Sequence, residues 1–131
     1  MEFFFRVWEK QIKEAEKLGI LRSHKNGKIS LIKKYLNKKL PVIVGIKSKA
    51  FYEGNPFWEK SIYNRKWPED TTHVIIVTGY KNGYYIYNDS SPFLHGDKGR
   101  DMKVSESRLK KAWKSAAYVK NAIFILEKIK K

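Results

Sequence analysis

Two residues with the chemistry of a catalytic pair flank a predicted β-hairpin. His73 opens one apolar run, residues 73–80, and Asp89 directly follows the next run, residues 84–88. In an antiparallel hairpin the start of the first strand lies beside the end of the second. A carboxylate next to an imidazole fixes its tautomer and raises its basicity, as in a catalytic triad. The alternative is a histidine at a strand edge and an aspartate in a turn.

The length of the connecting turn decides whether the two side chains share a face of the hairpin. A three-residue loop, Lys81-Asn82-Gly83, would put His73 and Asp89 on one face, about one diagonal step apart. A two-residue Asn82-Gly83 turn would put them on opposite faces, because side chains alternate along a strand. The sequence allows either turn, so the pairing is a conditional prediction.

The chain contains no cysteine. This excludes disulfides, thiolate metal sites and a cysteine nucleophile within these 131 residues. His95-Gly96-Asp97, with Asp101 nearby, could touch a metal ion, but we expect a solvated loop. No phosphate-binding Gly-x-x-x-x-Gly-Lys motif occurs. We therefore predict neither a metal site nor a cofactor.

The charge is strongly positive. Lys and Arg number 28 against 13 Asp and Glu, a net charge of +15. Such a field attracts nucleic acid, anionic membrane or an acidic partner, although a lysine-rich, heat-adapted surface is an alternative. Four residues of the segment 57–67 could stack on bases and hold phosphates: Trp58, Arg65, Lys66 and Trp67. The reading that we favour is a loop pinned to the domain by its tryptophans.

The order of predicted elements indicates one α+β domain over residues 1–131. Residues 1–40 are expected to be the helical part, with helices over 3–18 and 30–38, the second capped by Ser30. Residues 41–131 are expected to form an antiparallel sheet with a helix at about 105–116, capped by Ser105. The strands are predicted at 41–47, 73–80, 84–88, 102–104 and 118–126. No apolar run is long enough to span a membrane and nothing resembles a secretory signal, so we expect a cytoplasmic protein.

The ordered set of these segments resembles the C39-type peptidases, papain-like cysteine peptidases that include bacteriocin-processing domains. The matching pieces are a Pro-Val-Ile-Val strand at Pro41, a strand that opens on His73 and ends on Gly79-Tyr80, a strand that closes on Asp89, and a Ser-led helix with Trp113. The resemblance covers roughly residues 29–126. It implies a papain-like fold with N-terminal helices packed on the sheet. It also implies that His73 is the general base and Asp89 the residue that orients it.

The chain departs from the family pattern in two ways. Ser90 stands where a proline usually follows the aspartate, and the family's cysteine with its preceding glutamine has no match. The nucleophile helix normally lies well upstream of the histidine. We therefore expect this chain to begin after that helix, or to carry residues 3–18 in its place. A missing helix would expose apolar surface, which a homo-oligomer could cover.

The resemblance and the missing cysteine together predict a catalytically inactive C39-peptidase-like domain that binds a polypeptide or partner protein in a papain-like cleft. We expect no peptide cleavage by the chain alone. Two alternatives stay open: a basic domain that binds nucleic acid or another anion, and half of a split or truncated cysteine peptidase whose nucleophile comes from an upstream segment or a partner chain.

Overall fold

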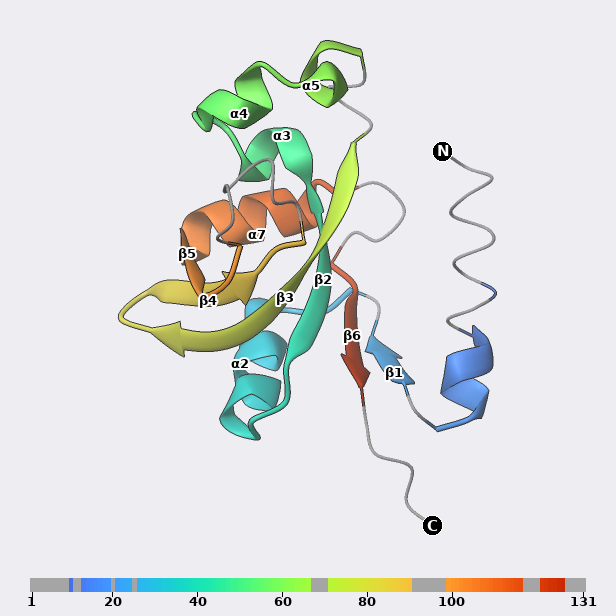
Figure 1. Ribbon diagram of the computed structural model, residues 1–131. Coiled ribbons are helices and arrows are strands. Elements are labelled where there is room, and N and C mark those ends of the chain that lie inside the picture. The colour runs from blue at the N-terminus through green and yellow to red at the C-terminus, as the bar shows by residue number, and fades with distance from the viewer. Residues whose placement is uncertain are drawn as a thin grey trace.

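The computed structural model describes residues 10, 13–19, 21–24, 26–66, 71–90, 99–116 and 121–126. These residues form a six-stranded antiparallel sheet in the order β1-β6-β2-β3-β4-β5 (Figure 1). The strands are β1 (Leu21–His24), β2 (Val42–Lys47), β3 (Thr72–Lys81), β4 (Tyr84–Asn88), β5 (Met102–Ser105) and β6 (Ile123–Leu126). The order places β2 and β3 in the middle of the sheet.

Two helices, α2 (Ile29–Asn37) and α7 (Glu106–Lys114), cover one face of the sheet. Three short helices connect β2 to β3: α3 (Ser48–Phe51), α4 (Pro56–Glu59) and α5 (Ile62–Lys66). Figure 1 shows these three helices gathered at the end of the sheet where β2 ends and β3 begins. That end also holds His73, so the connection lies beside the predicted catalytic pair.

The core follows from the alternation of side chains along the strands. Val42, Val44 and Ile46 of β2 are completely buried and stand opposite Val77, Ile75 and His73 of β3. The helices close this face with apolar side chains: Ile32 and Tyr35 from α2, and Leu109, Ala112 and Trp113 from α7. His73 therefore continues the row of β3 residues that faces the core.

The α+β class and the antiparallel sheet are confirmed, and so is the Ser105 cap, whose Oγ accepts from the backbone N–H of Arg108 at 3.3 Å. The predicted helical part, residues 1–40, also contains the edge strand β1 at residues 21–24, which was not predicted. Four residues are too short to show the period of a strand. Residues 13–17 are helical, whereas 3–9 and 11–12 of the predicted first helix lie outside the described residues.

Two predicted boundaries also differ. Helix α2 begins at Ile29 after the N-cap residue Lys28, which makes no side-chain cap, so the predicted cap at Ser30 was wrong. The last strand begins at Ile123 because Asn121 turns the chain with a φ of 52°. Residues 118–120 of that predicted strand lie outside the described residues. No helix within the described ranges is long and apolar enough to cross a membrane.

Candidate functional site

A β-bulge in the β3–β4 hairpin determines whether the side chains of His73 and Asp89 lie on the same face of the hairpin. The hairpin closes on the two-residue turn Asn82-Gly83, with φ values of 53° and 80°, and Lys81 stands opposite Tyr84. This turn alone would put the pair on opposite faces. The register shifts between Val77 and Gly79, however, so that Thr78 is an extra residue. Beyond the bulge His73 and Asp89 are again on one face.

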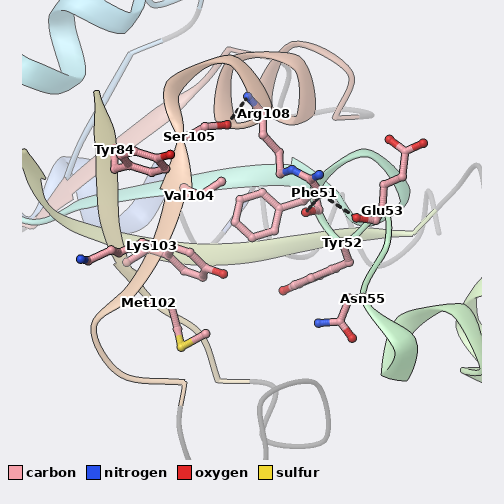
Figure 2. Close-up of a pocket in the computed structure, with 11 residues that line it drawn as sticks. Phe51, Tyr52, Glu53, Asn55, Tyr84, Met102, Lys103, Val104, Ser105 and Arg108 are labelled. Atoms are coloured by element: carbon pink, nitrogen blue, oxygen red, sulfur yellow. Dashed lines mark hydrogen bonds between the residues drawn. The ribbon is translucent and has the colours of Figure 1, made fainter. Parts of the chain in front are cut away.

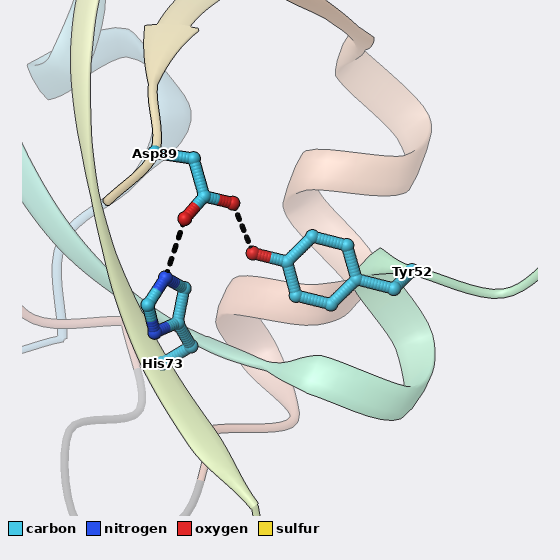
Figure 3. A network of polar contacts seen from close by, with 3 residues as sticks. All are labelled: Tyr52, His73 and Asp89. Carbon is cyan, nitrogen blue, oxygen red and sulfur yellow. Dashed lines mark hydrogen bonds and ion pairs between the residues drawn. The ribbon is translucent and has the colours of Figure 1, made fainter. Parts of the chain in front are cut away.

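The two side chains meet in a short hydrogen bond. His73 Nε2 lies 2.6 Å from Asp89 Oδ1 (Figure 3), within the range expected of a catalytic base and its orienting carboxylate. The Asp89 side chain is completely buried, whereas 24% of the His73 side chain is exposed. Because Nε2 faces the carboxylate, Nδ1 lies on the opposite side of the ring. The pair therefore has the geometry that a general base requires, and its catalytic role stays a prediction.

Tyr52 completes the network. Its hydroxyl donates a hydrogen bond to Oδ2, the second oxygen of Asp89 (Figure 3). The Tyr52 and His73 rings also pack, with centroids 6.2 Å apart. With a partner on each oxygen, the carboxylate plane is fixed, and the fixed carboxylate orients the imidazole. Sequence reasoning missed Tyr52, because no spacing rule connects a residue after β2 with an aspartate 37 positions later.

Burial changes the acidity of three tyrosines, and Asp89 contributes to the change in two of them, Tyr52 and Tyr87. Burial first, and then the hydrogen bond to Asp89, raises the pKa of Tyr52 far above its ordinary value. Burial raises the pKa of Tyr87 to about 12, with a further contribution from the negative charge of Asp89. Burial and a hydrogen bond to Glu106 raise the pKa of Tyr85.

These tyrosines should make the fold sensitive to alkali. Below about pH 10, the ordinary tyrosine pKa, the folded and unfolded states both keep these protons and the contribution to stability is complete. Above it the unfolded chain releases protons that the folded state retains, so stability should fall as the pH rises toward 12. Urea unfolding across this range measures the fall, and Tyr87→Phe should make it shallower. Lysines also titrate in this range, but they do so equally in the parent and in Tyr87→Phe. The control is Tyr63→Phe, because the Tyr63 side chain is exposed. An unchanged slope in Tyr87→Phe would contradict the assignment.

Backbone contacts with Gly99 fix the position of Asp89. Its N–H donates to the Gly99 carbonyl at 2.7 Å. Gly99 has a φ of +91°, and a Cβ built there would lie 2.4 Å from the Asp89 carbonyl oxygen. Since only glycine combines this φ with so close an approach, the Asp89 backbone position depends on Gly99.

A cavity of about 380 Å³ adjoins the network (Figure 2). Tyr52 and Tyr87 line it, and Tyr52 is the same residue that holds Asp89. Arg108 of α7 donates from Nη1 to the carbonyl oxygens of Phe51 at 3.2 Å and Glu53 at 2.7 Å, which ties one wall to α7. The other lining residues come mainly from the segment after α3 and from β5: Asn55, Tyr84, Met102, Lys103, Val104 and Ser105. His73 and Asp89 do not line the cavity themselves, and Tyr52 connects the cavity to the pair.

Of the four residues proposed to contact nucleic acid, the structure describes Trp58, Arg65 and Lys66. Trp58 is only 2% exposed and packs on Tyr52 with centroids 6.0 Å apart, so its ring is not presented to a base. Its burial matches the reading of this segment as one pinned by a tryptophan. Arg65 and Lys66 are exposed on α5, and Trp67 lies outside the described residues.

The described residues contain no group of three or more metal-ligating side chains. Asp101 begins the approach to β5, and its backbone N–H donates to Asn88 Oδ1 at 2.8 Å. His95 and Asp97, the other members of the weak metal candidate, lie outside the described residues.

Comparison with known proteins identifies the family of the chain. The model of the Peptidase C39-like family matches residues 6–121. The chain belongs to the Peptidase C39-like family. A search among curated proteins found no match.

One solved structure that resembles this chain is a protein from Bacillus anthracis described as a C39-like peptidase. The two superpose with a TM-score of 0.57 at 17% identity, over 88% of this chain and 56% of the other. The C39-like chain thus spans little more than half the length of that protein. At this identity the likeness shows the fold and leaves the activity to be argued from the site.

Proposed function

We propose that this C39-like chain binds an extended polypeptide beside His73 and does not cleave it alone. The observation that carries the proposal is the position of Tyr52. Its hydroxyl holds the buried Asp89 that orients His73, and the residue also lines the adjoining cavity. A ligand in that cavity would contact Tyr52, the residue that connects the cavity to the peptidase-like pair, in a chain without a cysteine.

The cavity suits an apolar side chain of such a peptide. Phe51, Met102 and Val104 contribute apolar wall, and Tyr84, which is 50% exposed, stands at the rim. Methionine adapts to different partners, and tyrosine gives large contact area with little entropic cost. Arg108 is occupied by two backbone carbonyls, so it shapes the wall and is not the main anchor for a ligand charge.

Strand β5, which lines the cavity, also offers backbone hydrogen bonds to a peptide. β5 pairs with β4 on one side, and no described strand pairs with its other edge. A strand edge beside an apolar pocket is the usual arrangement for an added peptide strand, in which the backbone gives affinity and the pocket gives specificity. The net charge of +15 favours an acidic peptide.

The test is fluorescence anisotropy with a labelled short acidic peptide that carries one central phenylalanine. We expect saturable binding that weakens about tenfold, or about 1.4 kcal/mol, when Tyr84 or Met102 becomes alanine, because the pocket wall is lost. Replacing the peptide phenylalanine by alanine should have a similar effect. Mass spectrometry should recover the peptide intact.

The matched control is Phe57→Ala, which removes another exposed aromatic side chain (58% exposed) that does not line the cavity. It should leave the affinity unchanged. Equal losses in Phe57→Ala and Tyr84→Ala would mean that the peptide binds elsewhere, and a cleaved peptide would contradict the proposed inactivity.

A further inference from the structure

A second cavity, of about 620 Å³, lies between the beginning of α2 and the second half of α7. It shares no lining residue with the cavity at Tyr52. Four of its lining residues are lysines: Lys28, which precedes α2, and Lys110, Lys111 and Lys114 of α7. The lysines thus come from two elements far apart in the sequence and surround one space.

The charge of this cavity is not balanced within its walls. None of the residues that line it is acidic. The nearby carboxylate of Glu106 pairs with Lys33, outside the cavity, at 3.0 Å. The positive charge of Lys110 also lowers the pKa of the Glu106 carboxyl, but it does so less than Lys33 and Tyr85 do. Gathered ammonium groups repel one another and attract anions.

Helix architecture explains only part of this cluster. Lys111 and Lys114 lie in the last turn of α7, where the helix dipole favours cations. Lys28 is the N-cap residue of α2, where the dipole disfavours a cation and a small polar residue is usual. The cavity therefore gathers more positive charge than its helices stabilise.

Besides the lysines, Ser30 and Asn121 are polar lining residues, and Ile29 and Trp113 are the large apolar ones. Trp113 is 2% exposed, and its Nε1 donates to the Ala122 carbonyl at 2.8 Å, which fixes the indole. Ile29 lies on the α2 side. The volume falls within the range of small-molecule pockets, roughly 300–1,000 Å³. Lysines are flexible point charges that suit phosphate oxygens.

We propose that this cavity binds a small ligand with several phosphate groups, of nucleoside triphosphate size, with the lysines on the phosphates and Trp113 and Ile29 against the rest. This site is separate from the proposed peptide site, and neither depends on the other.

Isothermal titration calorimetry of the 131-residue chain tests the proposal with two probes, ATP and tripolyphosphate. Both should bind saturably, and less tightly at about 200 mM than at about 50 mM salt. ATP should bind more tightly than tripolyphosphate, because Trp113 and Ile29 would contact the part of ATP beyond its phosphates. The double variant Lys111→Ala/Lys114→Ala should lose at least about tenfold in affinity for both probes.

The control is Lys34→Ala/Lys38→Ala, which removes the same charge from exposed positions of α2 and its C-cap that do not line the cavity. Its affinity should stay within about twofold of the parent, and circular dichroism should show both variants folded. Equal losses in the two variants would assign the binding to overall charge and overturn the proposal. Absence of saturable binding, or single-stranded RNA that binds while both small probes do not, would overturn it as well.

Discussion

Asp89→Ala is expected to destabilise the fold by about 2–3 kcal/mol. The substitution removes two hydrogen bonds to a buried carboxylate, one from Tyr52 and one from His73. The Tyr52 hydroxyl would then be left in the core without its acceptor, since the residue is only 4% exposed. Relief of the buried negative charge offsets part of this loss, which keeps the expected value moderate. Urea unfolding followed by tryptophan fluorescence measures it.

Asp89→Asn is the matched variant. The amide keeps the shape of the carboxylate, its oxygen can accept from Tyr52, and its NH₂ can donate to His73 Nε2. We expect it to lose less than half as much stability as the alanine variant. Tyr52→Phe combined with each Asp89 variant completes a double-mutant cycle that isolates the Tyr52–Asp89 bond. Additive losses in the cycle, or an Asp89→Ala protein as stable as the parent, would show that the network does not hold the fold.

A structural role for Asp89 would explain why a chain without a cysteine retains the pair. The carboxylate joins the end of β4 to Tyr52 at the end of α3 and to His73 on β3. Loss of the aspartate would thus cost stability even where no bond is cut. Retention of His73 and Asp89 is therefore weak support for catalysis, and the position of the cavity beside them is the better guide to function.

The sequence could predict which residues form the pair but not that they meet. The apolar runs of β3 and β4 and the Asn82-Gly83 turn signal locate the hairpin, and its turn is the two-residue type that the dipeptide favours. That turn alone predicts opposite faces. The bulge at Thr78 reverses the outcome, and it depends on how β3 packs between β2 and β4, which no local pattern encodes.

The segment between β2 and β3 shows a second limit of prediction from the sequence. Its length predicts short elements or a functional loop, and α3, α4 and α5 occur there. Alternating aromatic and basic residues were compatible with either a stacking surface or a buried anchor. Trp58 is the anchor, because its ring packs on Tyr52 in the core. The role of Tyr52 itself follows only from the fold, since its partner Asp89 comes from a distant strand.

Gly99→Ala is expected to destabilise the fold by about 3 kcal/mol or more, because two penalties combine. The φ of +91° is costly for any residue with a Cβ, by about 1 kcal/mol or somewhat more. The added Cβ would also lie 2.4 Å from the Asp89 carbonyl oxygen, so the backbone must move. Movement there would strain the bond between Asp89 N–H and the Gly99 carbonyl and displace the carboxylate from His73.

Gly54→Ala separates the two penalties. Gly54 has a similar φ of +86°, and a Cβ there would meet nothing within 4 Å. It should therefore show the conformational cost alone, about 1 kcal/mol. Urea unfolding of both variants gives the difference, and an NMR comparison of the His73 ring signals should show a shift in Gly99→Ala and none in Gly54→Ala. Equal losses of stability in the two variants would mean that the chain relaxes at Gly99 without disturbing Asp89. In that case the close backbone approach would not be what holds the carboxylate against the imidazole.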